Sequence, residues 1–212
     1  MKNEWESHWG RTYDPESKGR WLKPLFEQLE KEGKLGTVIV DVGSGTWSIL
    51  DNLPFTPQKK KVHIDIAAEN DDDSRVQFDV EKINQTDSIA FKRALLQTSE
   101  FLGIDPRKEQ STEHADTIVF SEILNYVDYQ EVLGGFNKYL KTGGRIIILN
   151  MPGRGVKDLF SEDGVKDNFE LFSFLEKSGF NIEYKMLPWK STIDADKAEE
   201  SNEMLVLVAV KK

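Results

Sequence analysis

The sequence has no cysteine among its 212 residues. Disulfide bonds, thiolate metal sites, iron–sulfur clusters and cysteine nucleophiles are therefore excluded. It also has no excess of positive charge, because 28 Lys and Arg stand against 37 Asp and Glu, for a formal net charge of -9. This balance argues against nucleic acid as a partner, and the short basic run Lys59–Lys61 fits a solvated turn better than a phosphate contact.

Long hydrophobic runs are missing as well. No segment reaches the roughly 18 apolar residues that a membrane span needs, and residues 1–18 contain no apolar centre of a secretion signal. We therefore expect a soluble, cytoplasmic protein that does not enter a membrane. No internal repeat and no long flexible linker divides the chain, so we expect a single domain over residues 1–212, with an N-terminal helical cap at 1–35 and a core at 36–212.

The chain does contain strand-like and helix-like segments in alternation. Runs rich in Val and Ile predict strands at 37–42, 61–66, 75–80, 116–120, 145–150, 181–187 and 203–211. Apolar periodicity predicts helices at 88–99, 128–140 and 169–177, the second of them ended by Gly143 and Gly144, and a loop at 101–115. This alternation predicts a parallel sheet with helices on both faces.

A glycine-rich turn follows the first predicted strand. Gly43 and Gly45 permit a tight turn and a close approach of the backbone to a ligand. Ser48 stands where a nicotinamide-binding G-x-G-x-x-G loop has its third glycine, and Asp41 would repel a pyrophosphate but attract a cation. An NAD(P)-dependent oxidoreductase is therefore the alternative and not the first interpretation.

Acidic side chains follow the next two strands at the same edge of the predicted sheet. Asp65 lies 20 residues beyond Gly45, which matches the offset of about 20 residues of the ribose-binding acid in nucleotide folds. Asp79 is placed to accept a hydrogen bond from an adenine amino group. S-adenosylmethionine fits this edge, since it has no phosphate and carries an ammonium and a sulfonium.

Several motifs together resemble the class I S-adenosylmethionine-dependent methyltransferases over about residues 36–212. VIVDVGSGT is similar to the family's glycine-rich motif, VHIDIA to its second-strand acid and VQFDVE to its adenine-contacting segment. ADTIVFSEILNYVD, FNKYLKTGGRIIILNMPG and LEKSGFNIEYK resemble its fourth, fifth and sixth strands. The resemblance implies an α/β, Rossmann-like, doubly wound and mostly parallel seven-stranded sheet with the last strand antiparallel, plus N-terminal helices.

The same resemblance implies a cofactor site for S-adenosylmethionine, and we expect no metal site in this chain. The glycine turn would hold the methionine end, Asp65 the ribose, and Asp79 the adenine. The residues placed against the cofactor are Asp41, Gly43, Ser44, Gly45, Asp65, Ile66, Asp79, Val80 and Ser121. Trp47 stands where many members carry glycine, and it either covers the cofactor or packs under the first helix.

Residues and motifs that the sequence lacks exclude several types of methyl transfer. Methylation of cytosine at carbon 5 and radical S-adenosylmethionine chemistry both need cysteine. The Asp/Asn-Pro-Pro-aromatic motif of amine methyltransferases acting on DNA and on glutamine is replaced by Ser121–Leu124. We therefore expect methyl transfer to an oxygen or nitrogen of a small-molecule acceptor, giving S-adenosylhomocysteine. A protein or tRNA acceptor, and a partner protein that binds the cofactor without turnover, stay open as alternatives.

The segment after the fourth strand supplies the first catalytic candidate. Glu122 is predicted to orient or deprotonate the acceptor, and Asn125, Tyr126 and Asp128 would face the acceptor if the resemblance holds. Arg154, in the loop after the fifth strand, either meets an anionic acceptor or belongs to a plain surface loop.

His8 is the second catalytic candidate. It lies among Trp5, Trp9 and Tyr13, whose four-residue spacing predicts one helical face. That face either covers the cofactor and shapes the acceptor pocket, or packs on the core or on a second subunit in a homodimer. His63 lies inside the second strand and is predicted to be an interior or edge residue.

Overall fold

The computed structural model describes residues 15–45, 48–53, 59–66, 74–84, 114–153, 157–186 and 205–212. They form a seven-stranded sheet of order β3-β2-β1-β4-β5-β7-β6. Its strands are β1 (Val38–Val42), β2 (Lys60–Asp65), β3 (Arg75–Gln77), β4 (Ala115–Ser121), β5 (Leu140–Asn150), β6 (Phe180–Met186) and β7 (Leu205–Lys211). The first five run parallel, and β7 pairs antiparallel with both β5 and β6. The predicted fold class is confirmed.

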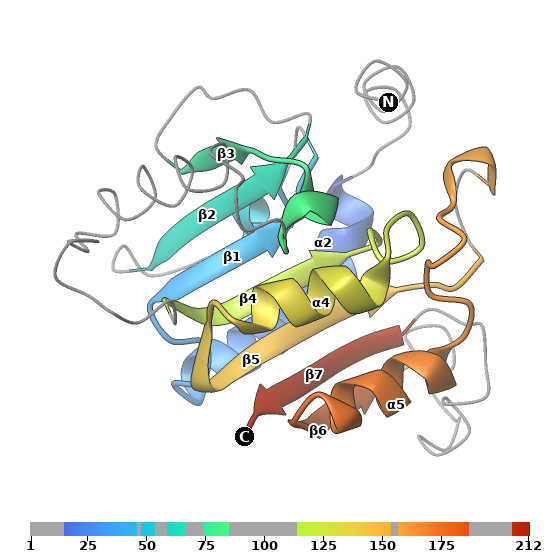
Figure 1. Cartoon of the computed structure of the whole chain (residues 1–212). Coiled ribbons are helices and arrows are strands. Elements are labelled where there is room, and N and C mark those ends of the chain that lie inside the picture. Colours follow the sequence, from blue (N-terminus) through green and yellow to red (C-terminus); the bar gives the residue numbers. More distant parts are fainter. Residues whose placement is uncertain are drawn as a thin grey trace, which may run out of the picture.

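Helices cover both faces of this sheet. They are α2 (Pro15–Lys31), α4 (Tyr129–Asn137) and α5 (Asn168–Lys177), with short 3₁₀ segments η1 (Ile49–Asn52), η2 (Val80–Lys82) and η3 (Lys157–Leu159). Figure 1 shows α4 and α5 in front of the sheet and α2 behind it. Alternate residues of β4 supply the two cores, since Ile118 and Phe120 pack on the α4 side and Val119 on the α2 side.

Two boundaries differ from those predicted. The helix predicted at 128–140 ends at Asn137, and the Gly143–Gly144 pair lies inside β5 instead of ending the helix. Ala115 pairs with Leu140 but Thr117 pairs with Arg145, so the glycines form a bulge in which Gly143 has a φ of 78°. The third strand ends at Gln77 and not at residue 80, because Asp79 caps η2.

Several sequence predictions lie outside the described residues. These are the helix at 88–99, most of the loop at 101–115, the N-terminal aromatic face and the polar stretch at 191–202.

The carboxylate of Asp116 connects three strands at the edge of the sheet where the parallel strands begin. Asp116 in β4 accepts hydrogen bonds from the backbone N–H groups of Thr37 and Val38, both at 2.9 Å, and from Lys141 Nζ at 2.8 Å. Burial alone would raise the pKa of Asp116, but these bonds outweigh it and lower the pKa below its ordinary value of 3.8. Asp116 thus ties the start of β1 to β4 and β5, at the edge opposite the carboxyl ends of the parallel strands.

We expect Asp116→Asn to lower the free energy of unfolding at neutral pH by about 1–3 kcal/mol, because two backbone N–H groups and Lys141 lose a charged acceptor. A lowered folded-state pKa stabilises the protein above the ordinary value of 3.8, and this contribution is lost as the pH falls through the folded-state pKa. Urea unfolding across this range measures the effect. The gap between wild type and variant should close on acidification, and a gap independent of pH would contradict the assignment.

Candidate active site

The glycine turn after β1 has the geometry that its sequence predicts. Gly43 and Gly45 have φ values of 73° and 65°, in the left-handed region that favours glycine. The N–H of Gly43 donates to Ile64 O at 2.8 Å, which attaches the turn to β2. A Cβ on Gly43 would overlap the Ile123 side chain, whereas a Cβ on Gly45 would meet no atom within 4 Å in the described part of the chain. The turn is therefore packed at Gly43, whereas no described residue fills the space beside Gly45.

Asp65 and the glycine turn meet at the end of β2. The N–H of Gly45 donates to Asp65 Oδ2 at 2.8 Å, although the two residues are 20 positions apart. Ile66 follows directly, and its carbonyl accepts from Gln77 Nε2 of β3 at 3.0 Å. A carboxylate accepts up to about four hydrogen bonds, so the bond from Gly45 is compatible with a further bond to a ribose diol.

Asp41 lies beneath the turn. Its side chain is 1% exposed, and Ser48 donates its hydroxyl proton to Asp41 Oδ2. Ser48 Oγ in turn accepts from the N–H of Leu50 at 3.0 Å and so caps η1. Buried Ser44 donates from Oγ to Gly45 O at 3.3 Å. Asp41 thus joins the two ends of the turn, while its attraction for a cation stays a prediction. Trp47 lies outside the described residues.

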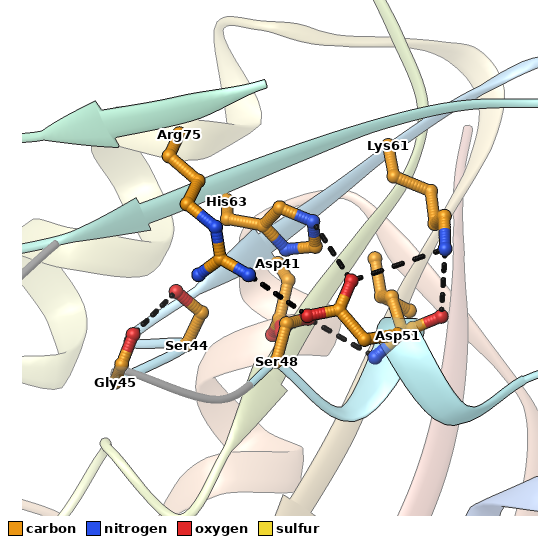
Figure 2. Close-up of polar contacts among 9 residues, drawn as sticks. Asp41, Ser44, Gly45, Ser48, Asp51, Lys61, His63 and Arg75 are labelled. Atoms are coloured by element: carbon orange, nitrogen blue, oxygen red, sulfur yellow. Dashed lines mark hydrogen bonds and ion pairs between the residues drawn. The ribbon is translucent and has the colours of Figure 1, made fainter. Parts of the chain in front are cut away.

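A cluster of charges holds η1 against β2 and β3. Figure 2 shows Asp51 between three basic side chains, with Arg75 Nη2 at 2.9 Å, His63 Nε2 at 3.5 Å and Lys61 Nζ at 3.9 Å from its carboxylate oxygens. His63 is buried, as predicted for an interior residue. The sequence analysis identified neither the capping role of Ser48 nor Asp51, although Ser48-Ile49-Leu50-Asp51 fits the S-x-x-D capping pattern.

The segment assigned to adenine is anchored on α4. Asp79 caps η2 by accepting from the N–H of Glu81 at 3.3 Å, and it pairs with Lys82 Nζ at 3.0 Å. Val80 is buried. Burial and the nearby Asp79 charge raise the pKa of Glu81, against a hydrogen bond from the Asp128 backbone. These contacts place Asp79 and Val80 at the carboxyl edge, beside the N-terminus of α4.

Glu122 has an unusual backbone at the end of β4. Its φ is 57°, and it is the one non-glycine residue with a positive φ among those the structure describes. This conformation costs an L-residue about 1–2 kcal/mol, and such costs gather at functional sites. The N–H of Glu122 donates to Leu149 O at 2.7 Å, and Ser121 before it is buried. Glu122 therefore has a fixed position between the ends of β4 and β5.

The other residues predicted to face an acceptor have different local roles. Asp128 caps α4 by accepting from the N–H groups of Gln130 at 3.1 Å and Glu131 at 3.0 Å. Tyr126 is buried, with its ring edge-on to Phe160 at a centroid distance of 5.3 Å. His8 and Arg154 lie outside the described residues.

Within the described ranges, no three His, Cys, Asp or Glu residues gather in a way that could hold a metal ion. Within the same ranges, no helix combines the length and the apolar character needed to cross a bilayer.

Comparisons of the sequence and the structure with known proteins identify the fold. No protein-family model and no curated protein matches the sequence. The chain does match solved structures, among them an S-adenosylmethionine-dependent methyltransferase from Clostridium acetobutylicum ATCC 824, with 12% identity and a TM-score of 0.52 over 99% of this chain and 96% of that one. Another is 1,6-didemethyltoxoflavin-N1-methyltransferase from Burkholderia thailandensis with bound S-adenosylhomocysteine, with 14% identity and a TM-score of 0.54 over 100% and 87%.

A third match comes from the complex of the Haloferax volcanii Trm112 methyltransferase activator with a methyltransferase, with 13% identity and a TM-score of 0.52 over 98% of this chain and 97% of that one. The mostly parallel seven-stranded sheet of this chain agrees with these matches. The chain has the fold of the class I S-adenosylmethionine-dependent methyltransferases.

Proposed function

We propose that this protein is an S-adenosylmethionine-dependent methyltransferase that methylates an oxygen or nitrogen atom of a small molecule and releases S-adenosylhomocysteine. The observation that carries the proposal is the hydrogen bond from Gly45 to Asp65, in a turn where no described residue fills the space beside Gly45. It joins a backbone suited to close ligand approach with a carboxylate suited to a ribose diol.

The described residues fit this cofactor. The glycine turn, with Asp41 and Ser44, would hold the methionine end, and Ser121 would lie near its carboxylate. Asp65 and Ile66 would hold the ribose. Asp79 and Val80 would line the adenine, on a segment fixed by its cap and by α4. No phosphate-cradling sequence is present, and the acidic edge suits a cationic ligand.

In methyl transfer the main task of the protein is to position the acceptor against the methyl group. When bound, S-adenosylmethionine supplies an electrophilic methyl carbon on a sulfonium. A bond from the acceptor to this carbon would replace the carbon–sulfur bond, whose electrons would stay on sulfur. Glu122 takes the proton that the acceptor oxygen or nitrogen must lose. The protein contributes orientation and exclusion of water, which are large effects in bimolecular displacements.

The first test is thermal unfolding with S-adenosylhomocysteine, S-adenosylmethionine and NAD in parallel. A ligand that binds only the folded state stabilises it by about 2.7 kcal/mol at a hundredfold excess over its dissociation constant. Stabilisation by the first two ligands alone is expected. Stabilisation by NAD alone would overturn the proposal in favour of an oxidoreductase. Binding of S-adenosylhomocysteine with no methyl transfer to any oxygen or nitrogen nucleophile would indicate a cofactor-binding partner protein instead.

Asp65→Ala is expected to weaken S-adenosylhomocysteine binding by about 5- to 150-fold, because loss of a charged hydrogen-bond partner costs about 1–3 kcal/mol. Isothermal titration calorimetry measures the dissociation constant. Glu176→Ala, at an exposed acid of α5, serves as the control and should leave the affinity unchanged. An unchanged affinity for Asp65→Ala would remove Asp65 from the site.

A further inference from the structure

Two buried asparagines join the ends of β4 and β5. Asn150, the last residue of β5, donates from Nδ2 to Asn125 Oδ1 at 3.0 Å. Asn125, in the loop that follows β4, donates from Nδ2 to Met151 O at 2.8 Å. Asn125 is 3% exposed and Asn150 is 0% exposed. We call these two side chains the amide pair.

The chemistry of the amide pair fixes the orientation of both side chains. The Met151 carbonyl can only accept, so it must face the Asn125 amide N–H group. Asn125 Oδ1 must then take a donor, which is Asn150 Nδ2. Asn150 Oδ1 is buried and has no hydrogen-bond partner within the described chain. Buried polar groups are normally paired, so a pair that leaves one oxygen unpaired is better explained by a role in the site than by stability alone.

Backbone contacts extend the amide pair to the segment after β5. The N–H of Ser161 donates to Asn125 O at 3.1 Å, and the N–H of Val165 donates to Leu124 O at 3.0 Å. Gly164 lies so close to Asn125 that an added Cβ would overlap the Asn125 carbonyl. The loop after β4 is therefore held between β5 and residues 161–165.

This arrangement fixes Glu122 from both sides. The N–H of Glu122 bonds to Leu149 O at 2.7 Å, directly before Asn150, and Asn125 is tied to Asn150 itself three residues later. A left-handed Glu persists only when its surroundings impose that conformation. We propose that Asn125 and Asn150 are positioning residues, which hold the Glu122 carboxylate toward the methyl group and its acceptor. The inference rests on the proposed function.

Sinefungin tests the position of Glu122 without knowledge of the acceptor. In this analogue of S-adenosylmethionine, a carbon bearing an ammonium group replaces the sulfonium and its methyl. If Glu122 faces the transferred methyl, wild type should bind sinefungin about tenfold or more tightly than S-adenosylhomocysteine, because an ammonium and a carboxylate form a charge-assisted hydrogen bond. Glu122→Gln should remove most of this preference.

Asn150→Leu then tests the amide pair, since leucine keeps the branched shape and removes the amide. The affinity for S-adenosylhomocysteine should stay within about twofold of wild type. The ratio of the dissociation constants of S-adenosylhomocysteine and sinefungin should fall to about one. Should this variant fail to fold, Asn150→Ser breaks the same bond without adding apolar bulk.

Thr117→Val is the matched control. Thr117 is also buried and donates from Oγ1 to Leu35 O at 2.8 Å, but it lies near the start of β4, far along the strand from Glu122. This variant should lower the melting temperature and keep the sinefungin preference. If the Asn150 variants also lower only the melting temperature, the amide pair is structural and the inference is overturned. If wild type binds S-adenosylhomocysteine but does not prefer sinefungin, the inference is overturned while the cofactor assignment stands. If neither ligand binds wild type, the proposed function fails too.

Discussion

Gly43→Ala is expected to lower the free energy of unfolding by about 2–5 kcal/mol and to abolish detectable S-adenosylhomocysteine binding. A side chain at φ 73° costs about 1–2 kcal/mol. The added Cβ would also lie 2.9 Å from Ile123 Cβ, where overpacking costs about 1–3 kcal/mol more. Because Ile123 follows Glu122 directly, relief of this clash would shift the turn and the loop after β4 together. Urea unfolding and calorimetric titration measure the two losses.

Alanine substitutions at two further glycines distinguish the cost of backbone strain from the loss of space for the cofactor. Gly33, at the end of α2, and Gly45 have φ values of 67° and 65°, and an added Cβ on either meets no atom within 4 Å in the described chain. Gly33→Ala and Gly45→Ala should therefore destabilise the protein equally, by about 1–2 kcal/mol. Only Gly45→Ala should also weaken S-adenosylhomocysteine binding. Equal affinities for these two variants would show that the space beside Gly45 does not belong to the cofactor.

The central strands β1, β4 and β7 could be predicted because most of their residues are apolar and buried. Residues 205–209 of β7 are all fully buried, and such a run of Leu, Val and Ala has few alternatives to a central strand. The Gly143–Gly144 bulge could not be predicted, since a glycine pair after a helix is equally typical of a stop signal. The glycines become a bulge inside β5 because Leu140 pairs with Ala115, and this pairing depends on the tertiary fold.

Residue type and spacing in the sequence correctly indicated that the turn after β1 and the end of β2 lie together. Gly45 and Asp65, 20 residues apart in the sequence, lie within hydrogen-bond distance. The bond between Asn125 and Asn150 was not predictable, because 25 residues separate two amides whose types suit many surface positions. The left-handed backbone of Glu122 had no sequence signal either, since Asn, Asp and Gly are the residues that favour this conformation.

Glu122→Gln is expected to lower kcat by about 10²- to 10⁴-fold, the usual contribution of a general base, with the dissociation constant of S-adenosylhomocysteine within about twofold of wild type. Glutamine keeps the size of the side chain and cannot take a proton at neutral pH. Steady-state kinetics with an acceptor found among small oxygen and nitrogen nucleophiles gives kcat, and calorimetry gives the affinity. Glu162→Gln, at an exposed acid, is the control and should retain full activity.

Equal losses of turnover and affinity in Glu122→Gln would make Glu122 a cofactor-binding residue, and no loss would mean that the acceptor reacts without this base. Glu122→Gly adds a stability readout. Glycine removes the carboxylate and also relieves the left-handed backbone, so this variant should be inactive yet about 1 kcal/mol more stable than wild type. Glu122→Gln keeps the backbone strain and should not gain that stability. Opposite changes in activity and stability at one residue would show that the strained backbone is retained for the sake of the carboxylate.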